Sequence, residues 1–263
     1  MAQIPRTNIL GVGVSALNLP LALETIAGWI ERRERHYVCV TNVHVVMECV
    51  RDPALRAQVN RAGLVTPDGM PLVWLSRRAG HSHVGRVYGP DLMLALCALS
   101  AERGYRPFFY GGAPGVAEAL AARMADRFPG LQVAGTTAPP FRTLTPAEQA
   151  AEIAQLNAAR ADILWVGLGA PRQERWMAAR RPHLDTPVLI GVGAAFDFHT
   201  GRVRQAPRWM MRAGLEWLYR LGREPRRLWR RYLINNPWFV YNIVLQQLGL
   251  RTWTMETEDG TQV

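Results

Sequence analysis

The chain has no lysine. Its 31 basic residues are all arginine, against 21 acidic residues, and the formal net charge is +10. A catalytic amine and the lysine of a phosphate-binding P-loop are therefore excluded, and any anion must be held by arginine or by backbone N–H groups. Cysteine is scarce as well, since Cys39, Cys49 and Cys97 are the only three and lack the spacing of a metal site. Because the polar start of the chain does not resemble a signal peptide, we expect free thiols in a reducing cytoplasm.

Long apolar runs and metal-binding motifs are missing too. A membrane-spanning helix needs roughly 18–20 apolar residues, and the nearest candidate, residues 237–250, is shorter and contains Asn242, Gln246 and Gln247. No Asp-x-Asp sequence is present to hold a diphosphate-bound cation. The histidines show no metal spacing apart from His81-x-His83, which lies in a polar loop. We therefore expect no transmembrane segment, no metal and no cofactor.

Short apolar segments alternate with amphipathic ones over residues 8–195. Strands are predicted at 8–14, 36–42, 64–67, 107–110, 131–135, 162–167 and 186–192, and helices at 19–30, 91–103, 116–128 and 146–160. This alternation predicts an α/β fold, a Rossmann-like parallel sheet with helices on both faces, at about 1–195.

The remainder of the chain has a different composition. Residues 202–231 contain ten arginines and two glutamates, which supply +8 of the net charge, and five of the nine tryptophans follow residue 200. We predict a C-terminal helical appendage over 196–263. Arginine interleaved with tryptophan suits an anionic membrane surface, whereas single-stranded nucleic acid is a rival partner that would use the same side chains. A solvated helical face with no ligand is the third interpretation.

A carboxylate stands at one predicted strand end, in Thr66-Pro67-Asp68-Gly69. Gly69 permits a sharp turn, and Pro71 suits the first turn of a following helix. Ligands of open α/β sheets bind at such strand ends, so Asp68 is a candidate general base. The alternative is that it only caps the helix.

Other strand ends carry further candidates. Asn42 follows a strand and either lines a site or caps a helix. Gly111-Gly112 lie between a strand and a helix, where backbone amides bind phosphate, although many such corners bind nothing. Gly11-x-Gly13-x-x-Ala16 matches a dinucleotide fingerprint, with Glu31 further on. However, Asn18 and Pro20 delay the helix, which argues against a nicotinamide or flavin site there.

Several motifs in the right order resemble the WecG/TagA/CpsF glycosyltransferase family, from about residue 8 to 240. The most specific are Pro171-x-Gln173-Glu174, residues 193–207 and the stretch Gly214-Leu-Glu-Trp-Leu-Tyr-Arg220. The resemblance implies transfer of a sugar from a UDP-sugar to a polyprenyl-diphosphate-linked sugar at the cytoplasmic membrane face. It also implies inversion and no divalent metal.

The resemblance also implies roles for individual residues. Asp68 matches the general base. The substrate-binding residues it implies are Asn42, Arg86, Gln173, Arg220, Arg227 and Arg230, of which the last three belong to an appendage that closes over the site. For the nucleotide we expect contacts with Gly111, Gly112, Gly169, Pro171, Gly193 and Asp197. Family members often have threonine two residues before the asparagine, where this chain has Val40, so a role for the adjacent Thr41 does not follow.

Two alternatives to the glycosyltransferase remain open. A nucleic-acid-binding protein would explain the basic, aromatic C-terminal segment but would leave Asp68 and Gln173 without a use. A non-catalytic nucleotide-binding protein would keep the glycine corners but would not require Asp68. Neither the donor sugar, the acceptor sugar nor the oligomeric state follows from the sequence, and a homo-oligomer remains open.

Overall fold

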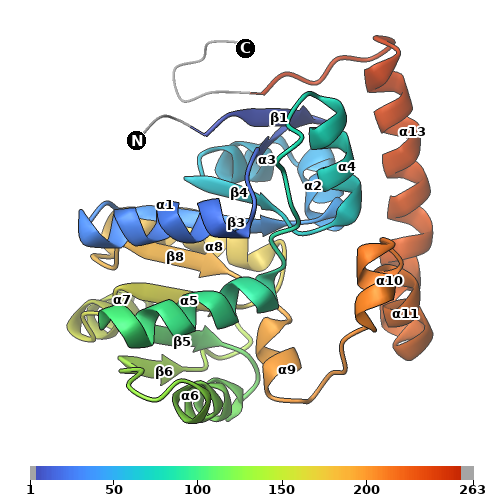
Figure 1. Ribbon diagram of the computed structural model, residues 1–263. Helices are drawn as coiled ribbons and strands as arrows, with labels where there is room; N and C mark the ends of the chain where they lie inside the picture. The colour runs from blue at the N-terminus through green and yellow to red at the C-terminus, as the bar shows by residue number, and fades with distance from the viewer. Residues whose placement is uncertain (1–3, 256–263) are drawn as a thin grey trace. The chain divides into compact units, whose positions relative to one another are not determined.

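The computed structural model describes residues 4–255 and contains a mixed set of strands and helices (Figure 1). A six-stranded parallel sheet has the strand order β4-β3-β8-β7-β5-β6, and β1 and β2 form a separate two-stranded sheet. The strands are β1 Arg6–Ile9, β2 Val12–Ser15, β3 His36–Thr41, β4 Leu64–Pro67, β5 Pro107–Gly111, β6 Gly135–Thr137, β7 Ile163–Gly167 and β8 Val188–Gly191. The predicted parallel α/β fold is confirmed.

Helices connect the strands of this sheet and make up the C-terminal part of the chain. They are α1 Leu19–Glu31, α2 Val43–Arg51, α3 Pro53–Asn60, α4 Met70–Arg78, α5 Gly89–Arg103, α6 Val116–Arg127, α7 Pro146–Ala158, α8 Arg172–Arg180, η1 Arg181–His183, α9 Ala195–His199, α10 Arg208–Arg212, α11 Glu216–Arg223, α12 Pro225–Trp229, η2 Arg230–Ile234 and α13 Asn235–Gln247. Within residues 4–255, none of these helices is long and apolar enough to cross a membrane.

The chain divides into two compact units. Unit 1 comprises residues 1–19, 40–88 and 205–263, and unit 2 comprises residues 20–39 and 89–204. These units do not test the functional domains predicted at 1–195 and 196–263, which stay a prediction. The ends of those predicted domains, residues 1–3 and 256–263, lie outside the described part of the chain.

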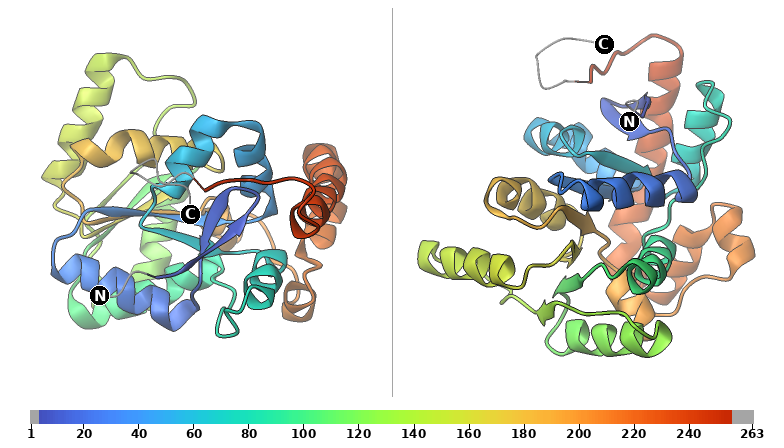
Figure 2. Two further views of the ribbon diagram at one scale, coloured as in Figure 1. Left: turned by 90° about the horizontal axis from the view of Figure 1, so that it is seen from above. Right: turned by 60° about the vertical axis from the view of Figure 1, so that its left-hand side comes forward.

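The core of unit 2 is the buried middle of the sheet. β3, β8, β7 and β5 run in parallel register, with Val38 opposite Ile190, Trp165 opposite Ile190 and Phe109 opposite Trp165. These positions are almost fully buried, as expected for parallel strands covered on both faces. Helices α1 and α5 lie on one face and α7 and α8 on the other (Figure 2).

Two predicted strands are wrong in detail. Residues 8–14 form a hairpin rather than one strand, because Leu10 and Gly11 have φ values of 53° and 84° and reverse the chain between β1 and β2. The Gly11 fingerprint therefore lies in an antiparallel hairpin, which excludes the strand–turn–helix geometry of a dinucleotide site. The strand predicted at 131–135 begins only at Gly135, where pairing with Phe108 starts.

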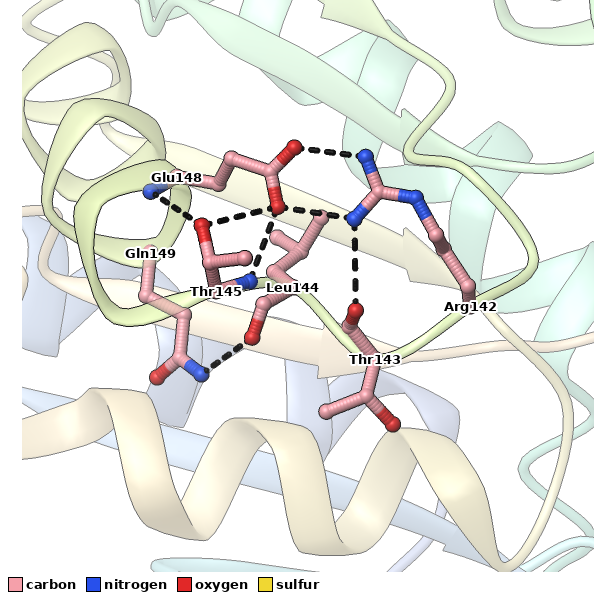
Figure 3. Close-up of polar contacts among 6 residues, drawn as sticks. All are labelled: Arg142, Thr143, Leu144, Thr145, Glu148 and Gln149. Carbon is pink, nitrogen blue, oxygen red and sulfur yellow. Dashed lines mark hydrogen bonds and ion pairs between the residues drawn. The ribbon is translucent and has the colours of Figure 1, made fainter.

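The helix predicted at 146–160 shows how local sequence set a boundary correctly. Thr145 and Glu148 form a reciprocal capping box at the start of α7, with Pro146 in its first turn. Arg142 binds the Glu148 carboxylate as well, and Gln149 donates to the Leu144 carbonyl (Figure 3). Each orphan amide or carboxylate oxygen here has a partner close in sequence, which is why the pattern is readable without tertiary information.

Gly111, at the end of β5, has a structural role that two variants can isolate. Its φ is +118°, and an added Cβ would lie 2.7 Å from the Gly167 carbonyl carbon in β7. Gly104 has a similarly positive φ of +73°, but nothing lies within 4 Å of its Cβ position.

We expect Gly111→Ala to lower the free energy of unfolding by about 3 kcal/mol or more, because backbone strain and a backbone clash add. Gly104→Ala should cost about 1 kcal/mol, from strain alone. Urea unfolding of the two variants tests this, and equal costs would refute the close approach as the reason for glycine at 111.

Candidate functional site

The Asp68 corner of unit 1 is held in place by its backbone. The Asp68 amide donates to the Thr41 carbonyl at 2.8 Å, and the Pro67 carbonyl accepts from the Val87 amide at 2.9 Å. Helix α4 begins after Gly69, which occupies the N-cap position, and no side chain caps this helix. The alternative that Asp68 only caps α4 is therefore wrong, and its carboxylate is available for other contacts.

Asn42 caps α2, as one of the two interpretations predicted, and its side chain also contacts the candidate base. Its Oδ1 accepts from the His44 and Val45 amides at 3.1 and 3.4 Å, which caps α2. Its side chain also hydrogen-bonds Asp68. Because helix amides bind the amide oxygen, the NH2 group remains as the donor to the carboxylate. Asn42 thus connects the start of α2 to the candidate base.

Arg86 lies between two carboxylates. Its Nε donates to the Asp68 backbone carbonyl. Its Nη2 donates to Asp68 Oδ1 at 3.3 Å and to Glu216 Oε2 at 2.6 Å. Tyr88 places its hydroxyl 3.5 Å from Glu216 Oε1, and the Arg86 guanidinium lies over the Tyr88 ring at 4.3 Å. The side chains of Asp68, Arg86 and Glu216 are all largely buried.

Burial makes Asp68 a stronger base than an ordinary aspartate. The pKa of Asp68 is raised to about 6, chiefly because desolvation disfavours the carboxylate. Arg86 and the Asn42 hydrogen bond lower this pKa, whereas the negative charge of Glu216 raises it. A carboxylate with such a pKa is still ionised at neutral pH and accepts a proton more readily than one at 3.8.

Three arginines of the C-terminal segment of unit 1 form a cluster. Burial lowers the pKa of Arg231, the positive charges of Arg220 and Arg227 lower it further, and the Asp68 carboxylate raises it. Arg231 Nε is buried without a hydrogen-bond partner among the described residues. Like charges held together, with a buried unsatisfied donor, are an arrangement that a bound anion stabilises.

Arg231 is turned inward, whereas its neighbour Arg230 is not. Residues 230–234 form a π-helical segment, η2, between α12 and α13. A π-turn changes the helical phase, so a spacing rule for an α-helix fails after it. Arg230 is exposed with its guanidinium over the Trp229 ring at 5.3 Å, and Arg227 is exposed and paired with Glu224.

Two contacts within unit 1 fix the C-terminal helices against the Asp68 corner. Gly214, with φ of +73°, approaches helix α4 so closely that an added Cβ would lie 2.9 Å from the Trp74 ring. Asn235 is buried and contacts helix α2, since its Oδ1 accepts from Arg51 and its Nδ2 lies 3.3 Å from His44 Nδ1. Together these contacts position α11 and η2.

Unit 2 contains the second group of predicted residues, around the start of α8. Gln173 is 3% exposed, and its Nε2 donates to Glu174 Oε1 at 3.0 Å. Gln173 Oε1 has no hydrogen-bond partner among the described residues. An added Cβ on Gly193 would lie 3.4 Å from this oxygen and 3.6 Å from Gly169 Cα. The structure therefore brings Gln173, Gly169 and Gly193 together, beside the cis peptide bond between Ala170 and Pro171.

The remaining predicted nucleotide contacts differ in character. Gly111 and Gly112 have packing reasons for being glycine, because an added Cβ would meet Gly167 or Val116 and Phe196. Gly169 has φ of +77° and nothing within 4 Å of its Cβ position, so it adjoins open space. Asp197 is half-buried, and its carboxylate lies 3.8 Å from Arg202. None of these observations tests nucleotide binding.

Sequence reasoning missed three residues of the unit 1 site: Tyr88, Glu216 and Arg231. Glu216 stands inside the motif that begins at Gly214, and Tyr88 follows Arg86 by two residues, so both had a local signal. Arg231 had none, because arginine spacing does not show which of several neighbouring arginines is buried. Across residues 4–255 no three His, Cys, Asp or Glu side chains gather as metal ligands.

Comparison with known proteins gives consistent matches. The family described as "Glycosyl transferase WecG/TagA/CpsF family" matches residues 7–252. A protein of Bacillus subtilis (strain 168) is 26% identical over 249 residues, which cover 92% of this chain and 94% of that protein. One from Bacillus spizizenii strain W23 is 30% identical over 205 residues, or 78% and 77% of the two chains. Both relatives are named N-acetylglucosaminyldiphosphoundecaprenol N-acetyl-beta-D-mannosaminyltransferase.

The arginine cluster predicts an anion site whose strength depends on Arg231. In buffer containing EDTA, Arg231→Gln should weaken inorganic pyrophosphate binding about tenfold or more, because a charge-assisted hydrogen bond contributes about 1.5–3 kcal/mol. Arg226→Gln, an exposed arginine of neighbouring α12, is the matched control and should change affinity less than twofold. Isothermal titration calorimetry measures both, and equal losses would show that only net charge matters.

Proposed function

This chain belongs to the WecG/TagA/CpsF family and is a glycosyltransferase, and we propose that it moves a hexosyl or N-acetylhexosaminyl group from a UDP-sugar to a polyprenyl-diphosphate-linked sugar in surface polysaccharide synthesis. The names of both relatives support the acceptor, since they specify a sugar diphosphoundecaprenol. The observation that carries the proposal is Asp68, a buried carboxylate with a raised pKa beside a cluster of arginines.

Asp68 is the general base of the proposed reaction. It removes the proton from the acceptor hydroxyl as that oxygen attacks the anomeric carbon of the donor. The bond from this carbon to the UDP oxygen breaks, and UDP leaves with the electron pair. A single displacement inverts the configuration, and the beta linkage in the relatives' names supports this for a donor with its nucleotide on the alpha face. Asn42 orients the carboxylate through the hydrogen bond described above.

Diphosphate charge is balanced by arginine rather than by a metal in this proposal. The positive charge that balances the diphosphate comes from three arginines of unit 1: Arg220, Arg227 and Arg231. Arg86 adds a further positive charge at the edge of the Asp68 corner. Arg230 keeps its predicted role as a substrate contact. Guanidinium groups hold phosphate oxygens bidentately and remain charged when partly buried. Pyrophosphate binding in EDTA therefore bears on metal independence as well as on Arg231.

Unit 2 supplies the donor-binding residues in this proposal. Gln173 Oε1 is a buried acceptor without a partner among the described residues, and such an oxygen suits a sugar hydroxyl. Gly169 and Gly193 expose backbone beside it, and Pro171 opens helix α8, whose first amides favour an anion. Gly111, Gly112 and Asp197 complete the nucleotide contacts that we propose.

The C-terminal helices of unit 1 suit contact with an anionic membrane surface, where a lipid-linked acceptor would be found. α13 and its surroundings expose large apolar side chains: Trp238, Val240, Tyr241, Val244, Leu248 and Leu250. The preceding helices expose arginines, and each basic residue near an anionic surface contributes about 1 kcal/mol. We propose peripheral attachment at the cytoplasmic face, with nucleic acid as the less favoured partner.

Removing the proposed base should abolish most turnover without affecting donor binding. Asp68→Asn keeps the size of the side chain but cannot accept the proton, so kcat should fall roughly 10²–10⁴-fold while UDP affinity changes little. In the unaltered enzyme kcat/KM should decrease as pH falls through about 6, because protonation removes the base. Unchanged turnover in Asp68→Asn would refute the assignment.

Membrane contact can be tested on the full chain. Replacing Leu248 and Leu250 with serine should reduce retention on vesicles containing anionic lipid, because those side chains are 66% and 70% exposed and lose their apolar contact. Phe141→Ser, at a position 80% exposed in unit 2, is the control and should bind vesicles normally. Retention on single-stranded DNA at equal salt, with none on vesicles, would support the nucleic-acid alternative instead.

A further inference from the structure

A second carboxylate beside the proposed base needs an explanation. Glu216 and Asp68 are both largely buried and both contact one nitrogen, Nη2 of Arg86. Two buried carboxylates thus compete for one guanidinium nitrogen in a low dielectric, where each such contact has a large effect. An ion pair built only for stability would need one carboxylate. The arrangement suggests that Glu216 acts on the chemistry of Asp68.

The contacts are unequal in a way that favours Glu216. Arg86 Nη2 lies 2.6 Å from Glu216 Oε2 but 3.3 Å from Asp68 Oδ1. Arg86 Nε is occupied by the Asp68 backbone carbonyl. The guanidinium is thus anchored to the Asp68 corner through the main chain, while its closest carboxylate is that of Glu216. Without Glu216, the same nitrogen would be free to move toward Asp68 and form a close ion pair.

We propose that Glu216 is a positioning residue: by binding Arg86 more closely than Asp68 does, it keeps the Asp68 carboxylate able to accept the acceptor proton. This inference rests on the proposed function, because it presupposes that Asp68 is the base. Glu216 itself need not touch substrate. Its position at the first residue of α11 makes the C-terminal segment responsible for the basicity of a residue in the β4–α4 corner.

Several other charges act on Asp68 and must be considered with Glu216. Within unit 1 the charged and titratable groups that interact electrostatically with Asp68, Glu216 or their partners are Arg86, Tyr88, Arg220, Arg227 and Arg231. Burial raises the pKa of Tyr88 far above its usual value, so its hydroxyl stays neutral. Arg86 and Arg231 favour the ionised form of Asp68, and Glu216 is a carboxylate that opposes them there. Loss of the negative charge of Glu216 should therefore lower the pKa of Asp68.

Glu216→Gln tests the proposal, because it removes the charge and keeps the shape. The pKa of Asp68 should fall by about one unit or more as Arg86 turns to it. The acidic limb of the kcat/KM profile should move to lower pH by the same amount, and kcat on the plateau should fall a few-fold because the base is weaker. The Asp68 carboxyl can be titrated directly by NMR of ¹³C-aspartate-labelled protein, with Asp68→Asn identifying its signal.

Glu224→Gln is the matched control, since it removes the same charge at the end of α11, where the carboxylate pairs with Arg227. It should leave the acidic limb and the Asp68 titration in place. An unshifted Asp68 titration in folded Glu216→Gln protein would overturn the proposal, as would an equal shift in Glu224→Gln. If Asp68→Asn keeps full turnover, the proposed base fails, whereas a shifted titration would still show the effect of Glu216 on Asp68.

Discussion

The sharing of one guanidinium between two buried carboxylates is the constraint on which unit 1 depends. Arg86 holds the β4–α4 corner through the Asp68 main chain and holds α11 through Glu216. Burial, with a smaller contribution from the negative charge of Glu216, raises the pKa of Asp68 and keeps this carboxylate basic. This ion network therefore connects distant segments and also affects the protonation of the proposed base. A substitution there should change both stability and reactivity.

The sheet and its corners were predictable because they depend on local rules. Alternating apolar runs gave the parallel α/β fold, and Thr145 with Glu148 marked the start of α7. Asp68 and Asn42 were recognisable because polar residues directly follow buried strands. The wrong strand predictions occur where backbone geometry outweighs the hydrophobic pattern. At Leu10–Gly11, for example, positive φ values turn the chain, so that one predicted strand is a hairpin.

Prediction from local sequence was less successful for the C-terminal segment. Arg220 was predicted and the structure places it in the cluster, whereas Arg231 was missed because its burial depends on tertiary packing. Glu216 looked like one charge among many, and its importance comes from Arg86, far away in the sequence. Long-range pairing of this kind has no local signature. The Gln173 corner of unit 2, by contrast, was marked by its motif, although its ligand stays a prediction.

The hairpin formed by β1 and β2 has a consequence for folding. Asn8 donates to the Trp253 carbonyl, and the Leu10 amide donates to Gln246, so β1 and β2 are completed by residues 245 and 236 positions away in the sequence. Unit 1 is also interrupted by the continuous stretch 89–204 of unit 2. Unit 2 can thus form from segments closer in sequence, while unit 1 requires three distant segments to come together, which slows folding. The Asp68 corner should therefore be completed only after this long-range closure of unit 1.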